Sequence, residues 1–219
     1  LILATGASSV IPPIPGLDGP KVLSLYRFED AERIKEFLVQ KPAAEVFIIG
    51  GGLVGIETAE ALLSRGARVT VFEKDSQILK QFDADLSNKL AELLRLKGIK
   101  VLTDVTIKEV KQIGERLILL ADCGEFQGDL IILSAGVKPN AELGAQAGLD
   151  LGHGGGIQVD ECLRTSDPAI YAIGDCSETK NLLSQNSLHL PLGSVSTKMG
   201  RIAADNIAGF KSVFKGSLG

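Results

Sequence analysis

Apolar residues along this chain form two kinds of pattern, short continuous runs and longer stripes with a helical period. Residues 46–49 and 69–72 are continuous runs rich in valine, isoleucine and phenylalanine, which is typical of strands buried on both faces of a parallel sheet. A helical pattern extends from residue 53 to residue 65, and a second one at residues 84–97 carries a leucine stripe. These elements predict a Rossmann-like α/β fold with a parallel sheet.

The pattern changes after a further parallel strand, which is predicted at residues 99–102. Residues 105–110, 117–120 and those after 124 are short segments separated by tight turns, which predicts an antiparallel β-meander. Residues 130–133 are again a continuous apolar run, and we expect them to return to the parallel sheet. The predicted fold class is therefore a Rossmann-like parallel sheet with helices and an antiparallel β-meander.

Further elements are predicted on either side of this region. Buried strands are expected at residues 1–4 and 169–173. Asp30 is expected to cap a short helix that ends near residue 39, and a final helix is expected from about residue 193 to residue 208. Residues 11–16 contain three prolines and cannot be helical, so they are interpreted as a rigid connector.

Composition limits the class of protein. The 219 residues are 45% hydrophobic and 23% charged, as in a soluble globular chain with one large or two small domains. A net charge of −4, without a lysine or arginine cluster, argues against a nucleic-acid partner. No apolar run approaches the roughly 20 residues that span a bilayer, and no signal segment opens the chain. We therefore expect a cytoplasmic protein with no membrane partner.

Cysteine and histidine are sparse in the sequence. Cys123, Cys162 and Cys176 are scattered without a C-x-x-C spacing, so neither a disulfide framework nor a redox pair is visible. His153 and His189 are isolated and are interpreted as surface residues, so we predict no metal site. Residues 1–4 already have a strand pattern and no methionine precedes them. We expect that further sequence lies upstream in the complete protein.

A glycine-rich turn joins the strand at residues 46–49 to the helix that follows. Gly50, Gly52 and Gly55 have the G-x-G-x-x-G spacing, which permits a tight turn, close approach to a pyrophosphate, and close packing of helix on strand. The positive end of the helix dipole would face the diphosphate. The same glycines could serve only to let the chain reverse, so the context must decide.

The second strand ends in an acid at Glu73, close to the roughly 20-residue offset at which a carboxylate meets an adenosine ribose. Such a carboxylate accepts hydrogen bonds from ribose hydroxyls and repels a 2′-phosphate. The site is therefore predicted to prefer NAD(H) over NADP(H), although Lys74 follows directly and Arg68 is near in sequence. The alternative is an ordinary solvated acid at a strand end.

Two further pairs of residues follow predicted strands and are candidate ligand contacts. Ala135 and Gly136 follow the run at residues 130–133, at the carboxyl edge where ligands bind in such sheets. Gly174 and Asp175 end the run at residues 169–173, and this acid suits a polyol hydroxyl. A helix-capping role for Asp175 is the alternative.

The motifs occur in an order found in one family. They are Ala4-Thr5-Gly6, the proline connector, the glycine turn with Glu73, the meander, Ala-Gly-Val-Lys-Pro-Asn at residues 135–140, and Tyr-Ala-Ile-Gly-Asp at residues 171–175. Over essentially the whole chain they resemble the FAD- and NAD(P)-dependent pyridine nucleotide-disulfide oxidoreductases. Residues 191–209 further resemble the NADH oxidase and coenzyme A-disulfide reductase branch.

The resemblance implies an NAD(P)-binding domain, residues 26–150, inserted into a partial FAD-binding domain formed by residues 1–25 and 151–219. Such an enzyme passes hydride from NAD(P)H to FAD and on to a disulfide, oxygen or sulfur acceptor. Glu57 would order the site where nicotinamide meets flavin. The residues implied to bind the NAD dinucleotide are Gly50, Gly51, Gly52, Leu53, Val54, Gly55, Glu57, Glu73, Lys74, Ala135 and Gly136, and those implied to lie at the FAD are Thr5, Gly6, Gly174 and Asp175.

Three parts of the family pattern have no counterpart in this chain: the first glycine-rich FAD motif, the redox-active cysteine and the C-terminal interface domain. No catalytic residue is therefore assigned, and Cys176 is interpreted as packed rather than reactive. We expect a fragment that binds NAD(H), purifies without flavin and shows no turnover. The full-length protein would hold FAD and form a homodimer.

Two other functions are compatible with parts of the pattern. A non-catalytic module could use the dinucleotide site to sense redox state for a partner. An S-adenosylmethionine-dependent transferase also has a glycine-rich first turn and a second-strand acid, but the meander and the distant Gly174-Asp175 pair argue against it.

Overall fold

The computed structural model describes residues 1–218, which fold into two compact units. One unit consists of residues 9–136. The other combines Leu1–Ser8 with the residues from Val137 onward, so that the first unit is inserted in the sequence of the second. We call residues 9–136 the inserted unit and the remainder the split unit.

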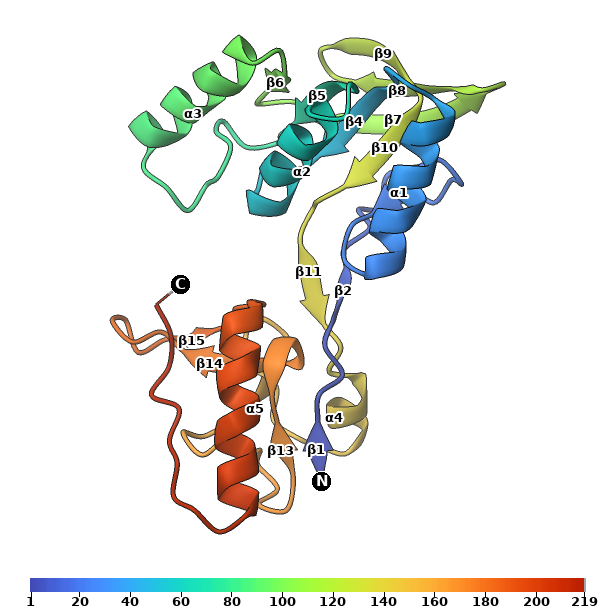
Figure 1. The fold of residues 1–219 in the computed structure, drawn as a ribbon. Coiled ribbons are helices and arrows are strands. Elements are labelled where there is room, and N and C mark those ends of the chain that lie inside the picture. Colours follow the sequence, from blue (N-terminus) through green and yellow to red (C-terminus); the bar gives the residue numbers. More distant parts are fainter. Residues whose placement is uncertain (219) are drawn as a thin grey trace. The chain divides into compact units, whose positions relative to one another are not determined.

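A five-stranded parallel sheet forms the centre of the inserted unit (Figure 1). Its order is β3-β10-β4-β5-β6, and every neighbouring pair is parallel. The predicted return of residues 130–133 to the sheet is confirmed, since β10 lies between β3 and β4. The strands are β3 (Val22–Ser24), β4 (Glu45–Ile49), β5 (Arg68–Phe72), β6 (Lys100–Leu102) and β10 (Leu130–Leu133).

Three helices pack on one face of this sheet, and the predicted meander packs on the other. Side chains of the central strands alternate: Val46 and Ile48 of β4 point into the core with the helices, whereas Phe47 and Ile49 point into the core with the meander. Both faces are buried, as the continuous apolar runs predict. The helices are α1 (Phe28–Gln40), α2 (Leu53–Leu63) and α3 (Ala84–Leu96), and the meander strands are β7 (Ile107–Ile113), β8 (Arg116–Ala121) and β9 (Gly124–Gly128).

Aromatic rings join the meander to the sheet. Phe72 of β5 lies edge to face with Phe47 of β4, with ring centroids 5.4 Å apart, and with Phe126 of β9 at 4.9 Å. Such edge-to-face pairs stabilise by about 0.5–1.5 kcal/mol beyond the burial of their area. These contacts give the meander the position that a second layer of helices usually has in a Rossmann-like fold.

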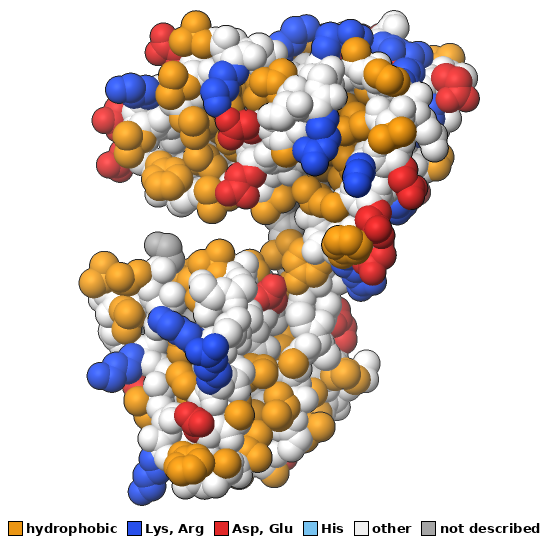
Figure 2. Space-filling model, viewed as in Figure 1, with side chains coloured by type: hydrophobic (Ala, Val, Ile, Leu, Met, Phe, Trp, Pro, Cys, Tyr) orange, Lys and Arg blue, Asp and Glu red, His pale blue; other side chains and the backbone are white. Residues whose placement is uncertain are grey.

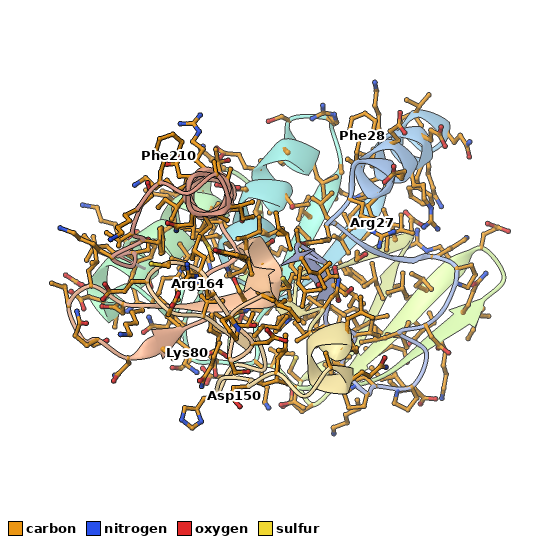
Figure 3. All side chains as sticks on the ribbon, turned by 90° about the horizontal axis from the view of Figure 1, so that it is seen from below. Arg27, Phe28, Lys80, Asp150, Arg164 and Phe210 are labelled. Carbon is orange, nitrogen blue, oxygen red and sulfur yellow. The ribbon has the colours of Figure 1, made fainter. Side chains whose placement is uncertain are left out.

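Helix α1 begins at Phe28, before Asp30, so Asp30 is not the N-cap residue that the sequence predicted. Arg27 is the N-cap, and Arg27 and Phe28 are labelled at this end of the helix in Figure 3. The Asp30 carboxylate accepts hydrogen bonds from the backbone N–H groups of Tyr26 and Arg27, so it closes a capping box from the third helical position. The acid caps the helix end from inside the first turn.

The split unit contains shorter elements. Its strands β1 and β13 are parallel, β12, β14 and β15 form a three-stranded sheet, and β11 pairs with β2. Met199 of the last helix is 1% exposed and belongs to the core. The elements are β1 (Ile2–Leu3), β2 (Ala7–Ser9), β11 (Val137–Pro139), α4 (Glu142–Gln146), β12 (Ile157–Gln158), β13 (Tyr171–Ala172), a 3-10 turn η1 (Gly174–Cys176), β14 (Ser177–Lys180), β15 (Ser187–Leu188) and α5 (Gly193–Ile207).

The compact units divide the chain between residues 8 and 9 and between 136 and 137, whereas the sequence interpretation divided it at 25/26 and 150/151. Residues 9–25 join the inserted unit because β3 pairs with β10. Residues 137–150 join the split unit because Ala141 and Leu149 pack in one core with Ile157 and Leu3. Long-range pairing of this kind is not visible in a local sequence pattern.

The surface carries charges of both signs. Figure 2 shows acidic and basic side chains interspersed with apolar ones on the face that it displays. Among the helices of residues 1–218, none has the length and apolarity that a membrane-spanning helix needs.

Asp129, between β9 and β10, is a buried acid with three charged or polar partners. Its side chain is 2% exposed, and its Oδ1 lies 2.7 Å from both Lys41 Nζ and Arg116 NH1, while the Glu45 N–H donates to Oδ2 at 2.9 Å. Burial by itself raises the pKa of Asp129, but the bonds from Lys41 and Glu45 and the charge of Arg116 outweigh it and hold the pKa below its usual range. The ionised acid therefore joins the starts of β4 and β8 to the end of α1.

We predict that Asp129→Asn lowers the free energy of unfolding by about 1–2 kcal/mol at pH 7, since both cations are partly solvated and screened. A lowered folded-state pKa gives stability that is present above the unfolded-state pKa and lost as the pH falls through the folded one. The difference between wild type and variant, measured by urea unfolding, should shrink below about pH 4. Glu109→Gln, which breaks a more exposed pair with Lys111, is the control. A difference that stays constant down to pH 2 would contradict the assignment.

Candidate functional site

The glycine turn between β4 and α2 is built from close backbone contacts. Gly50 has φ of 111°, a region that L side chains rarely adopt, and a Cβ there would overlap the carbonyl of Ser134, directly after β10. A Cβ on Gly55 would overlap the Gly50 carbonyl. The first and third glycines are thus required by the packing of strand, turn and helix.

Gly52 differs from the other two glycines of the motif. A Cβ built on Gly52 meets no heavy atom within 4 Å, so the fold itself does not demand glycine at this position. Gly52 is also the N-cap of α2, and it provides no side-chain cap for the first N–H groups of the helix. Open space at a helix N-terminus is what a close approach of a phosphate group requires.

Glu73 is bound to the glycine turn directly. Its Oε2 accepts the Gly51 N–H at 2.6 Å and its Oε1 accepts the Asp75 N–H at 2.8 Å. The carboxylate therefore fastens the end of β5 to the turn, in addition to the ribose role predicted from sequence. Because each carboxylate oxygen has two lone pairs, acceptor capacity remains for a ligand hydroxyl.

A cavity of about 500 Å3 opens beside this turn. Its volume lies within the usual range for small-molecule sites. On its wall, the Ser134 hydroxyl oxygen is buried and has no hydrogen-bond partner among the described residues. The cavity is lined by Pro12, Pro13, Ile14, Ile49, Gly50, Gly52, Phe72, Glu73, Lys74, Asp75, Val105, Thr106, Ile107, Ser134 and Ala135.

Of the two basic residues considered from the sequence, Lys74 lines this cavity and Arg68 does not. Arg68 begins β5 and pairs with Glu45 at 2.8 Å. It lies five positions before Glu73, roughly 17 Å along an extended strand, so Arg68 is near the predicted ribose contact in sequence but not in space. Lys74 is exposed and lines the cavity, and Lys80 forms an ion pair with Asp75 at 3.0 Å.

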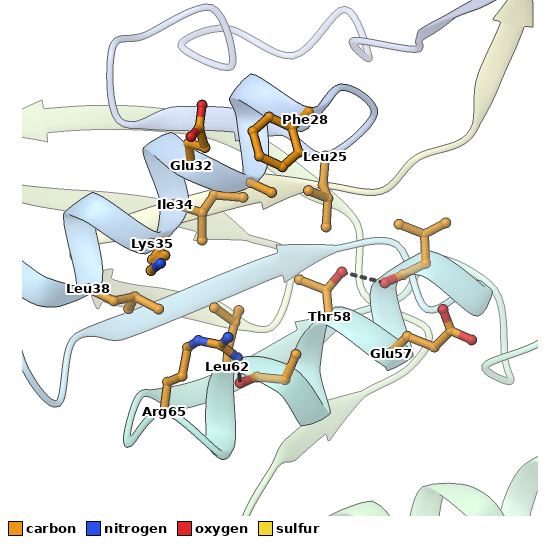
Figure 4. A pocket seen from close by; sticks show the side chains of 13 residues that line it. Leu25, Phe28, Glu32, Ile34, Lys35, Leu38, Glu57, Thr58, Leu62 and Arg65 are labelled. Atoms are coloured by element: carbon orange, nitrogen blue, oxygen red, sulfur yellow. Dashed lines mark hydrogen bonds between the residues drawn. The ribbon is translucent and has the colours of Figure 1, made fainter.

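Leu53, Val54 and Glu57 do not line this cavity. Val54 and Glu57 instead line a second one of about 510 Å3 between α1 and α2, with Phe28 and Leu38 on its α1 side (Figure 4). Leu53 is half exposed. The structure therefore divides the predicted dinucleotide residues between two sides of the start of α2.

In the split unit, Thr5 and Gly6 form a turn that Asn140 fastens. The Thr5 hydroxyl donates to the Asn140 carbonyl, the Asn140 amide donates to the Thr5 carbonyl at 2.9 Å, and the Asn140 N–H donates to the Gly6 carbonyl at 2.9 Å. Ser8 donates to the Asn140 Oδ1 at 2.7 Å. Asn140 was part of the motif quoted from sequence, but it was not selected as a site residue.

Gly174 and Asp175 form the η1 turn at the end of β13. Gly174 has φ of 71°. The Ser196 hydroxyl, in the first turn of α5, donates to the Asp175 Oδ1 at 2.9 Å, and His189 Nε2 lies 2.8 Å from the Asp175 carbonyl oxygen. The sequence pattern indicated neither partner, because His189 is isolated and was interpreted as a surface residue. Their position near the start of the helix that follows η1 was the available signal.

Cys176, next to this acid, is fully buried, with its Sγ 3.3 Å from the Ile173 carbonyl oxygen. It is packed, as predicted. Among residues 1–218, no three histidine, cysteine, aspartate or glutamate side chains gather in a way that could hold a metal ion.

Known proteins share this fold and these motifs. Residues 1–199 match the family model described as pyridine nucleotide-disulphide oxidoreductase. The chain is 36% identical to the NAD(P)H sulfur oxidoreductase (CoA-dependent) of Pyrococcus abyssi over 100% of its own length and 49% of the relative's. It is 34% identical to the NADH oxidase of Methanocaldococcus jannaschii, over 98% of the chain and 48% of the relative. The chain thus spans about half the length of the curated relatives it matches.

A solved structure shows the same arrangement. It is that of a FAD-dependent pyridine nucleotide-disulphide oxidoreductase from Desulfovibrio vulgaris, with a TM-score of 0.91 and 33% identity, covering 100% of this chain and 56% of that one. The parallel sheet, the meander and the order of the motifs are accounted for by one relationship. The chain belongs to the pyridine nucleotide-disulphide oxidoreductase family.

Proposed function

We propose that this chain is the NAD(H)-binding portion of a flavin-dependent oxidoreductase that passes hydride from NAD(P)H to FAD and on to a disulfide, oxygen or sulfur acceptor. The observation that carries the proposal is the cavity at the glycine turn. One cavity at the carboxyl edge of the sheet is lined by Gly52, Glu73 and Ser134. Gly52 leaves open space there, Glu73 supplies a carboxylate, and Ser134 supplies a hydroxyl without a hydrogen-bond partner among the described residues. Sequence relatives named for NAD(P)H and a structural relative named for FAD support the same chemistry.

The residues of the inserted unit would bind and orient the dinucleotide. Gly52 would leave room for the diphosphate at the start of α2, and Glu73 would accept a ribose hydroxyl with its remaining lone pairs. Ser134 would supply a further hydroxyl to the ligand. When bound, the nicotinamide supplies the hydride. The role of these protein residues is to hold the dinucleotide in place.

We infer a preference for NAD(H) over NADP(H). The Glu73 carboxylate would repel a 2′-phosphate, and Arg68, engaged with Glu45, is not available to attract one. Lys80 is paired with Asp75, which leaves Lys74 as the exposed cation of the cavity lining. The balance of charge therefore favours an unphosphorylated ribose.

The flavin half of the proposal concerns the split unit. Thr5, Gly6, Gly174 and Asp175 would lie at the FAD, with the Asp175 carboxylate suited to a ribityl hydroxyl. The Asn140 bonds and the η1 turn hold both segments in defined conformations, which supports this role. The chain has about half the length of its curated relatives, so we propose that it does not complete the reaction by itself. For the whole protein we propose a cytoplasmic homodimer.

Gly52→Ala should fold like the wild type but bind NADH at least about tenfold more weakly, because its methyl group occupies the space that a diphosphate needs. Isothermal titration with NADH and thermal unfolding measure the two effects. Gly200→Ala is the matched control, because a Cβ on Gly200 likewise has room: it meets one atom, at 4.0 Å. Gly200 lies in α5 of the split unit, outside the proposed dinucleotide site. Unchanged NADH affinity in Gly52→Ala would contradict the site.

Glu73→Ala should weaken NADH binding by about 1–3 kcal/mol, as expected for loss of a partly buried acceptor. Because Glu73 also fastens the Gly51 turn, loss of affinity alone does not isolate its ribose role. The affinity for NADPH should fall less than that for NADH, since the repulsion of the 2′-phosphate is removed at the same time. Competition titrations with both nucleotides give this ratio, and a ratio equal to that of the wild type would contradict the proposed ribose contact.

The purified chain should be colourless and should not oxidise NADH with oxygen or a disulfide as acceptor. Absorbance at 450 nm and at 340 nm measure these two properties. A chain that purifies with one FAD per molecule, or that turns over, would contradict the proposal that it is an inactive portion. NADH binding without oxidation by any longer protein that contains the chain would favour a redox-sensing module.

A further inference from the structure

The turn that carries Asp175 is too short to be stable by itself. The η1 turn has three residues, and no side chain caps its N-terminus. Gly174 at its start has a left-handed φ of 71°. Ser177, directly after the turn, donates its hydroxyl and its N–H to the Gly174 carbonyl. The remaining restraint on Asp175 must come from other segments of the split unit.

One such restraint is the hydrogen bond from His189. A carbonyl oxygen can only accept, so the His189 Nε2 must carry the proton that it donates to the Asp175 carbonyl, over 2.8 Å. The bond joins positions 14 residues apart in sequence. It acts on the backbone of Asp175 and leaves the carboxylate to other partners.

His189 is itself held in place. It follows β15, which pairs antiparallel with β14 through Leu188 and Thr179. Within β15, the Ser187 hydroxyl donates to the carboxylate of Glu178, which is 2% exposed. The imidazole therefore projects from a fixed strand end toward the turn.

A second restraint acts on the side chain of the same acid. The Ser196 hydroxyl donates to the Asp175 Oδ1, and a Cβ on Gly174 would lie 3.4 Å from the Ser196 oxygen. Asp175 is thus held at its carbonyl by His189 and at its carboxylate by Ser196. The first bond restrains the backbone of the turn, and the second contacts the carboxylate directly.

We propose that His189 is a positioning residue of the flavin side of the site, acting through its bond to the Asp175 carbonyl. This inference rests on the function proposed above, because it takes the Asp175 carboxylate as a contact of FAD. His189 needs no contact with the flavin. Its effect is to keep the η1 turn in the conformation in which the Asp175 carboxylate meets a ribityl hydroxyl.

The experiment compares His189→Leu, His189→Gln and His153→Leu with the wild-type chain. FAD is added to the purified chain, and its binding is followed by quenching of flavin fluorescence up to millimolar chain concentration. His189→Leu should weaken FAD binding about tenfold, because the donor is lost. His189→Gln should restore most of the affinity, since its amide nitrogen can donate from a similar position. His153 is exposed, and His153→Leu is the control for loss of a histidine.

NADH titration and thermal unfolding of the same variants separate positioning from general damage. Both should be unchanged in His189→Leu, and hydrogen exchange at residues 174–177 should become faster. FAD affinity equal to the wild type in His189→Leu, or equally poor in His189→Gln, would overturn the proposal. It is also overturned if the wild-type chain binds no FAD at these concentrations. In that last case saturable NADH binding would show that the dinucleotide site of the proposed function nevertheless stands.

Discussion

The candidate site depends on one constraint, the close packing of the Gly50 turn against the residue that follows β10 and against the first turn of α2. The Gly50 backbone approaches the Ser134 carbonyl so closely that no Cβ fits, and Gly55 approaches the Gly50 carbonyl in the same way. These two contacts place the start of α2 directly over the end of β4. The position of Glu73, which binds the Gly51 N–H, depends on the same turn. The candidate dinucleotide site is therefore a consequence of backbone packing, with Gly52 as the position left open.

The layers on either side of the sheet explain where the cavity lies. Alternate side chains of β4 and β10 enter the helical core, and the others enter the core shared with the meander. The edge-to-face rings of Phe47, Phe72 and Phe126 hold the meander against the sheet. Because a meander occupies this face, Val105 to Ile107 at its start line the cavity together with residues of the glycine turn.

Much of the fold was predictable because its signals are local. Continuous apolar runs marked β4, β5 and β10, and glycine spacing marked the turn before α2. The predictions that were wrong or incomplete concern residues whose role depends on distant partners. Arg68 is near Glu73 in sequence but lies at the opposite end of β5, and Asp30 caps its helix from within the first turn. His189 and Ser196 became visible as partners of Asp175 once the chain was folded, because these contacts span 14 and 21 residues.

The sequence by itself determined the fold class and the residues of the glycine turn, since these follow from periodicity and from spacing along one segment. It also indicated the family, through a resemblance in the order of motifs along the whole chain. Tertiary structure decided which of those residues share a cavity. It placed Glu73, Lys74 and Ala135 beside Gly50 and Gly52, and it turned Val54 and Glu57 toward the space between α1 and α2. The physical reason is that the direction of a side chain around a helix or at a strand end depends on packing against segments far away in the sequence, which no local pattern contains.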